Sequence, residues 1–214
     1  MRCRIYCLVL LLGGCSGYSE YIESAPRLTN PQSSFLITTL EKGTKGLDKE
    51  KNWLLVEPYN EKLISRTTVI LGIKNTGPGE YVPPSAFVIS IDYILNNKKR
   101  NRFEVDGKLT LQNGEVIEPV RVFSSNTAEC SIHRGKHQIK YLDRHAIIEL
   151  EESNYPCLRF EYPLMSDDPR ITPEIASGKT FTMLFGTLLG SSRKDDERVE
   201  IKFYPQESRA YSGP

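Results

Sequence analysis

The sequence predicts an all-β protein, an antiparallel β-sandwich, on three observations. Short apolar runs rich in β-branched and aromatic residues recur along the chain. Each run is bounded by Gly, Pro, Asn, Asp or Ser, and no segment carries a sustained apolar stripe at helical spacing. Many short strands without helices are typical of a sandwich or a barrel. The chain has 214 residues, of which 39% are hydrophobic, and this is enough for a core of its own.

The expected strands follow one another closely, and turn signals separate them. Asp106-Gly107 and Asn113-Gly114 predict hairpin turns because both dipeptides tolerate positive φ. The Lys-Asn-Thr-Gly-Pro-Gly segment at 74–79 predicts the end of a strand. Pro173 to Ala176 predicts a single helical turn, with Thr172 as its N-cap and Gly178 as its end. In order, the expected strands are 35–40, 53–56, 67–73, 87–95, 102–111, 116–124, 137–142, 145–150, 157–162, 179–186 and 198–204.

Within this pattern, residues 67–95 suggest a particular kind of sandwich. A β-branched strand is followed by an Asn-Thr-Gly turn, by Pro83-Pro84 and by a long apolar strand. This order resembles the immunoglobulin-like domains of envelope proteins. The resemblance implies an immunoglobulin-like sandwich over residues 34–214.

The first fourteen residues have the layout of a secretory signal peptide. Arg2 and Arg4 give a positive start, an apolar run extends to Leu12, and Gly13-Gly14 precede Cys15. The apolar run is about half of the roughly 20 residues that a helix needs to span a bilayer. Leu12-Gly13-Gly14-Cys15 resembles the lipobox of bacterial lipoproteins. This resemblance implies cleavage before Cys15 and a diacylglycerol on its thiol, and Ser16 resembles the pattern sorted to the outer membrane.

Residues 15–33 are expected to be a lipidated cysteine followed by a flexible tether. Gly, Ser, Pro and Asn recur through this stretch and predict that it forms no regular element. The predicted organisation is therefore a signal peptide at 1–14, a tether at 15–33 and one sandwich domain at 34–214. Cleavage removes two of 28 basic residues and leaves 26 against 27 acidic residues, a net charge of −1. Such a balance gives no reason to expect a nucleic-acid partner.

Two cysteines remain for disulfide formation. Cys3 and Cys7 leave with the signal peptide, and Cys15 takes the lipid. An exported chain meets an oxidising compartment, so we expect a Cys130–Cys157 disulfide. Two buried thiols are the alternative.

Several polar motifs contain residue types that occur in phosphate, metal or catalytic sites. Gly178-Lys179-Thr180 lacks the earlier glycine of a phosphate loop, because position 173 is Pro, so it predicts a turn into a strand. The three histidines, which do not predict a metal site, are His133, His137 and His145. Three acidic clusters do not predict a facing catalytic pair, because adjacent acids in a strand point to opposite faces. They are Asp167-Asp168, Asp195-Asp196-Glu197 and Glu149, Glu151 and Glu152, and the segments around Asp167-Asp168 and Asp195-Asp196 predict loops. We expect no cofactor and no catalytic residues.

One basic run is a candidate contact for an anionic partner or lipid headgroup, although it also suits a solvated hairpin tip. Its residues are Lys98, Lys99, Arg100 and Arg102.

These features favour a non-enzymatic envelope lipoprotein, anchored through Cys15 and facing the periplasm from the outer membrane. Its partner would be a protein of the envelope, either an assembly component or a toxin that the lipoprotein neutralises. The alternative is a domain that binds or hydrolyses cell wall or carbohydrate. That alternative requires a groove lined by aromatic residues such as Trp53, Tyr81, Tyr93 and Tyr155.

Overall fold

A computed structural model describes residues 16–39, 47–48, 51–70, 73–78, 85–94, 101–125, 140–143, 145–150 and 157–212. These residues form strands in two sheets that pack together, so the predicted all-β sandwich is confirmed. The immunoglobulin-like variant stays a prediction. The strands are β1 (Ser16–Leu28), β2 (Phe35–Thr39), β3 (Asn52–Pro58), β4 (Lys62–Ile70), β5 (Ile73–Pro78), β6 (Ala86–Ile94), β7 (Asn101–Leu111), β8 (Val116–Ile117), β9 (Arg121–Ser125), β10 (Lys140–Leu142), β11 (Ile147–Leu150), β12 (Cys157–Met165), β13 (Phe181–Leu189) and β14 (Glu197–Ser212).

The larger sheet has the order β11-β7-β13-β14-β1-β4-β5, with β8 paired to β7. The smaller sheet has the order β10-β9-β12-β6-β3-β2. Neighbouring strands are antiparallel except β2 and β3, which run parallel. The expected helical turn is present as a short 3-10 helix, η2 (Ile175–Ser177), which ends at Gly178 in the left-handed conformation (φ 60°). Its N-cap is Glu174 rather than the expected Thr172.

The core lies between the sheets, where alternate side chains of each strand point inward. Aromatic rings join the two layers. The ring of Phe87 in β6 meets Phe181 of β13 edge to face at 5.9 Å, and Phe160 of β12 meets Phe185 of β13 at 6.0 Å. Burial of such rings is the main stabilising contribution of the core.

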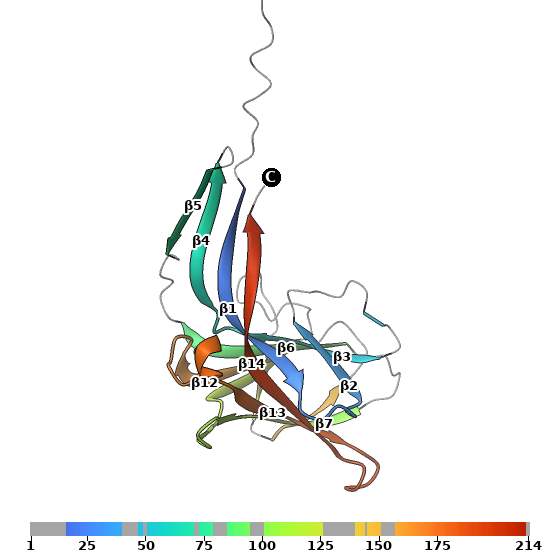
Figure 1. Ribbon diagram of the computed structural model, residues 1–214. Coiled ribbons are helices and arrows are strands. Elements are labelled where there is room, and N and C mark those ends of the chain that lie inside the picture. The colour runs from blue at the N-terminus through green and yellow to red at the C-terminus, as the bar shows by residue number, and fades with distance from the viewer. Residues whose placement is uncertain are drawn as a thin grey trace, which may run out of the picture.

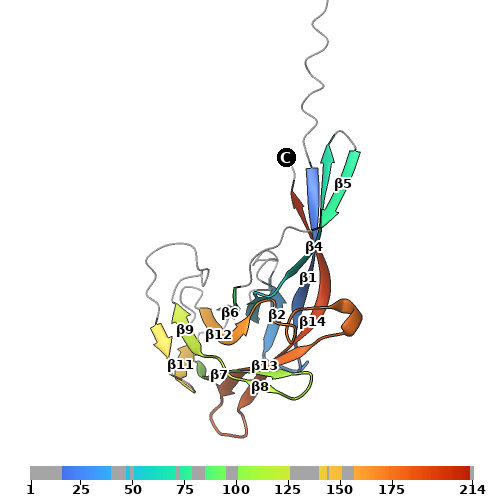
Figure 2. The ribbon, with the colours of Figure 1, turned by 90° about the vertical axis from the view of Figure 1, so that its left-hand side faces the viewer.

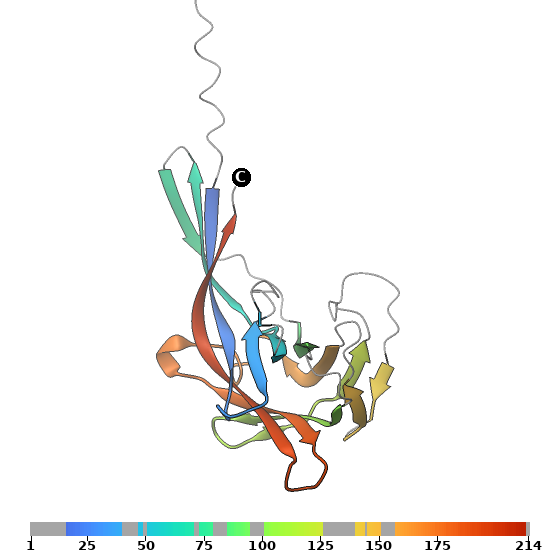
Figure 3. The same ribbon diagram turned by 90° about the vertical axis from the view of Figure 1, so that its right-hand side faces the viewer.

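One part of the larger sheet extends beyond the sandwich as a projecting arm (Figures 1 and 2). We define the arm as Ser16–Glu23 of β1, Tyr204–Ser212 of β14, and strands β4 and β5. Strands β1 and β14 continue from the arm into the sandwich, so one antiparallel ladder of twelve paired positions runs through both parts. Figure 3 shows the same two strands crossing from the body into the arm.

The expectation of an irregular tether is wrong for residues 16–28, which form β1. Small residues do not prevent a strand here, because β1 lies between β14 and β4 and pairs with both. Pro26 is tolerated because it lies beyond the last residue paired with β4, Ile22, where β1 is open on that side. Residues 29–34 are irregular, as expected.

Two expected turns are also wrong. Residues 74–78, expected to end a strand, lie in β5 and pair back onto β4. Asp106-Gly107 forms no hairpin and lies inside β7, where both residues stand opposite Phe185 as a β-bulge. Gly107 has a φ of 86° there, and a Cβ at this position would lie 2.4 Å from the Phe160 ring. Asn113-Gly114 does form a turn, closed by the Gly114 amide donating to the carbonyl of Leu111 at 3.0 Å.

Candidate functional site: the strand arm

The arm is held together by a polar ladder that crosses its four strands. The Glu20 carboxylate of β1 accepts hydrogen bonds from Ser65 of β4 at 2.8 Å and from Arg209 Nε of β14 at 3.0 Å. Two positions further toward the end of the arm, Thr67 and Thr76 share a hydrogen bond of 2.9 Å between β4 and β5. Direct cross-strand pairs of this kind stabilise a sheet. The ladder therefore gives the arm fixed strand positions.

Arg209 also stacks over an aromatic pair on the same face. Its guanidinium lies 5.3 Å from the centre of the Tyr18 ring, and the Tyr18 and Tyr211 rings are 6.1 Å apart. Two hydrogen bonds lower the pKa of Glu20, the larger effect coming from Ser65 and the smaller from Arg209. The hydrogen bond to Glu20 is the main cause of the raised pKa of Arg209. The pair therefore stays charged across the physiological range.

The base of the arm is pinned to the sandwich by a buried amide. Asn60, just after β3, donates from Nδ2 to the Ser24 hydroxyl of β1 at 3.0 Å and to the carbonyl of Ile171 at 2.8 Å. Asn60 is 1% exposed. A buried amide that bridges two segments resists their separation, because opening would leave its donors unpaired. The arm therefore leaves the body at a fixed place.

Along the arm, no strand of the described residues pairs with the outer edge of β14. Strand β13 pairs with β14 only as far as Phe203, and no later residue of β14 pairs with β13 in the described part of the chain. Thr29 donates its amide to Glu200 at 3.0 Å, which makes even-numbered positions of β14 the hydrogen-bonded partners of β1. The odd-numbered residues therefore point their backbone groups away from β1.

The outward positions of β14 are Pro205, Glu207, Arg209 and Tyr211. Proline lacks an amide hydrogen, and it is found on edge strands where that amide would face solvent. No described residue forms a backbone hydrogen bond with the amides of the other three or with the carbonyls of all four, so within the described ranges these groups can pair with another extended chain. Unpaired edges of this kind are templates for strand addition.

The far end of the arm has a different character. Ser16 pairs with Val69, Gly17 pairs with Ser212, and Ile70 pairs with Ile73. The start of β1, the end of β14, the end of β4 and the start of β5 therefore lie at the same end, away from the sandwich (Figure 1). We call this end the arm tip.

Most residues predicted from sequence to be functional fall outside the described residues. These are Cys15, Cys130, Lys98, Lys99 and Arg100. Arg102 is described, lies in β7 opposite Glu149 of β11, and is exposed. Cys157 begins β12 and is 0% exposed. The Cys130–Cys157 disulfide and the anionic contact of the basic run both stay predictions.

Among the histidines, only His145 belongs to the described residues. Its Nδ1 lies 3.6 Å from a carboxylate oxygen of Glu104, and its φ of 59° is left-handed. No group of three or more His, Cys, Asp or Glu side chains within the described ranges is placed to hold a metal ion.

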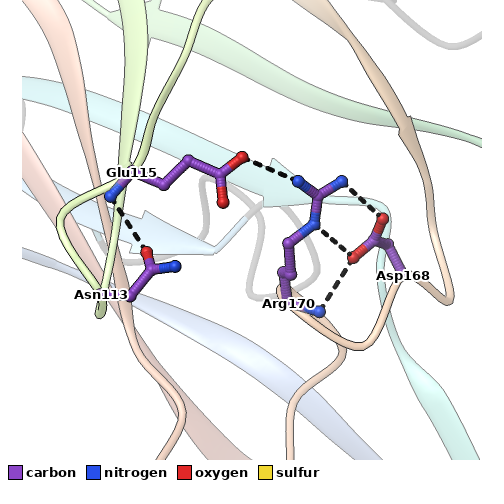
Figure 4. A network of polar contacts seen from close by, with 4 residues as sticks. All are labelled: Asn113, Glu115, Asp168 and Arg170. Atoms are coloured by element: carbon purple, nitrogen blue, oxygen red, sulfur yellow. Dashed lines mark hydrogen bonds and ion pairs between the residues drawn. The ribbon is translucent and has the colours of Figure 1, made fainter.

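Two of the acidic clusters, at Asp167-Asp168 and at Asp195-Asp196-Glu197, accept hydrogen bonds that stabilise turns. The Arg170 guanidinium donates from Nε and Nη2 to the two oxygens of Asp168, at 3.0 and 2.9 Å, and from Nη1 to Glu115 at 2.8 Å (Figure 4). The Arg170 hydrogen bond is the main cause of the lowered pKa of Asp168. Glu197 accepts hydrogen bonds from Ser33 and Ser34, which fixes the turn between β1 and β2.

Trp53 and Tyr93, two of the four aromatics considered for a groove, point to opposite faces of the smaller sheet. Leu54 of β3 lies opposite Tyr93 of β6, and both belong to the core. Trp53 precedes Leu54 and so faces the other way. Tyr81 and Tyr155 lie outside the described residues.

The second face of the smaller sheet carries buried polar residues that sequence reasoning missed. Ser90 and Asp92 of β6 are 2% and 7% exposed, and Arg159 of β12 is 6% exposed. Burial raises the pKa of Asp92 to about 7. The Arg159 guanidinium lies over the Phe123 ring at 5.4 Å. The alternation of Phe87, Ile89 and Ile91 was visible in the sequence, but nothing in it indicated that the opposite face is also buried.

Comparison with protein-family models, with curated proteins and with solved structures finds no match for this chain. Within the described residues, no helix has the length and apolar character needed to cross a bilayer.

Proposed function

We propose that the protein is a non-enzymatic lipoprotein of the bacterial envelope that binds an extended segment of a protein partner along the open edge of β14. Lipid on Cys15 anchors the chain, and the domain faces the periplasm from the outer membrane. The observation that carries the proposal is the outward row of backbone groups at Pro205, Glu207, Arg209 and Tyr211, opposite the ladder with β1.

The chemistry of this edge suits strand addition. A partner strand would gain main-chain hydrogen bonds to three amides and four carbonyls, and alternate side chains would decide which partner fits. Glu207 is a charged residue on this edge, and charged edge residues limit indiscriminate pairing. Fixed strand positions in the arm lower the entropic cost of docking.

The test combines crosslinking with a change confined to one backbone amide. A photo-crosslinking amino acid replaces Tyr211, which is 77% exposed, in cells that express the full-length chain. We expect one specific protein adduct in the envelope fraction. Glu207→Pro removes an outward amide hydrogen and leaves the bonds to β1 intact, so it abolishes the adduct.

The matched control is Glu207→Ala, which removes the side chain and keeps the amide. We expect this variant to retain the adduct. The same crosslinker at Val116 of β8, 55% exposed on the body, should give no adduct of that size. Absence of any adduct at Tyr211, or an adduct that survives Glu207→Pro unchanged, would contradict strand addition at this edge.

A further inference from the structure

The arm tip differs from the rest of the arm in residue type. At the tip, β4 ends in Val69-Ile70 and β5 begins with Ile73, whereas the next residues inward are Thr67, Thr68, Asn75 and Thr76. Ile73 is 74% exposed, one of the most exposed large apolar side chains of the described residues. Such exposure in a soluble domain marks a surface for interaction when it coincides with other apolar residues.

Aromatic and basic residues flank this apolar end. The Tyr18 and Tyr211 rings lie one pair inside the Gly17–Ser212 pair, and Tyr211 is 77% exposed. Lys74, next to Ile73, is exposed. It is the single charged residue among those that end the four strands at the tip, which are 16–19, 67–70, 73–76 and 210–212. An exposed isoleucine with tyrosines and a lysine on neighbouring positions is typical of a protein surface at a bilayer interface.

The residue proposed to carry the lipid directly precedes the strand that starts at this end. Ser16, the first residue of β1, directly follows Cys15 and pairs with Val69. Consecutive Cα atoms are about 3.8 Å apart, so a lipid on Cys15 would hold the tip next to the bilayer surface. This step rests on the proposed lipid anchor.

We propose that the arm tip docks in the headgroup region of the bilayer that holds the lipid of Cys15, with Ile73 in contact with lipid and Tyr211 at the headgroup level. The membrane then contacts the protein at two points, the acyl chains and the β4–β5 end. The arm acts as a fixed spacer. From Ser16 to Ser24, eight strand steps of about 3.3 Å place the sandwich about 25 Å from the surface.

This geometry has a consequence for partner binding. The open edge of β14 runs along the arm, between the tip and the sandwich (Figure 3). A partner strand paired to that edge therefore lies in the space between the bilayer and the body, at a height set by the arm.

The test uses the mature lipoprotein, purified from membranes and reconstituted in vesicles of phosphatidylethanolamine and phosphatidylglycerol. An environment-sensitive fluorophore is attached to Ile73→Cys or, as the matched control on the same strand, to Pro78→Cys. Both positions are exposed, and Pro78 lies at the other end of β5, about 17 Å away at 3.3 Å per residue. Intact mass confirms one label and the lipid on each chain.

We expect the label at position 73 to shift its emission to shorter wavelength and to be quenched several-fold more strongly by nitroxide-bearing lipid than the label at position 78. Quenching by lipid separates membrane contact from self-association of the tip. Equal emission and quenching at both positions on a chain whose lipid is confirmed would overturn docking of the tip and leave the anchor standing. A mature chain without lipid would overturn both the anchor and the docking.

Discussion

Asp92 makes the stability of this protein depend on pH in an unusual direction. The carboxyl is 7% exposed, and burial raises its pKa from 3.8 to about 7. No hydrogen bond or ion pair to Asp92 is seen among the described residues to offset the loss of solvent. We therefore predict that Asp92→Asn, which keeps the shape and removes the charge, stabilises the folded state at high pH.

The sign follows from proton binding. The folded state holds the Asp92 proton more tightly than the unfolded state, so this contribution to stability is complete below pH 3.8 and is lost as the pH rises through about 7. A shift of about three pKa units corresponds to about 4 kcal/mol in total. Between pH 5 and pH 8 the wild-type protein loses about 2–3 kcal/mol of unfolding free energy from this group.

Urea unfolding at pH 5 and pH 8, followed by circular dichroism, measures the difference. The gain of Asp92→Asn over wild type should be larger at pH 8 than at pH 5 by about 2–3 kcal/mol, with the denaturant slope unchanged. Asp167→Asn, at an exposed position, is the matched control, and its effect on the unfolding free energy should be the same at pH 5 and pH 8. If the difference in unfolding free energy between Asp92→Asn and wild type is the same at pH 5 and pH 8, the assignment of a buried, neutral carboxyl is wrong.

Three further changes test the packing of the sandwich and the expected disulfide. Tyr162→Phe removes a buried hydrogen bond of 2.7 Å from the hydroxyl to the Gly107 carbonyl, and should lower the unfolding free energy by about 1–2 kcal/mol in urea. Gly186→Ala places a Cβ 2.3 Å from a backbone carbonyl oxygen of β7, so a lower melting temperature and a cost of about 2–3 kcal/mol are expected. If Cys130 and Cys157 are joined as predicted, reduction adds two hydrogen atoms to the intact mass and lowers the unfolding free energy by about 3 kcal/mol. An unchanged mass would show that both cysteines are free thiols.

The sandwich was predictable because its signals are local. In β6, core residues alternate at Phe87, Ile89 and Ile91, and in β13 at Phe181, Met183 and Phe185, which is the two-residue period of a strand that turns one face toward the core. The Asn113-Gly114 turn follows equally from the two residues that form it. The observed strand ends differ from the expected ones by a few residues, because pairing partners rather than propensity decide where a strand ends.

The arm was not predictable from the same signals. Residues 16–28 contain glycine, serines and proline, and their strand depends on β14, which is almost the whole chain away in sequence. The β5 residues Asn75 and Gly77 have turn character, yet pairing with β4 holds them extended. Glu20 and Arg209 meet only because of that distant pairing, so no local motif marks the ladder.

The intact mass of the mature protein extracted from membranes, for wild type beside Cys15→Ser, tests the lipid anchor directly. We expect a wild-type chain that starts at Cys15 and carries diacylglycerol and an acyl chain, and a Cys15→Ser chain that carries neither. A wild-type chain that is uncleaved, or cleaved without lipid, would contradict the anchor on which the function and the orientation of the arm depend.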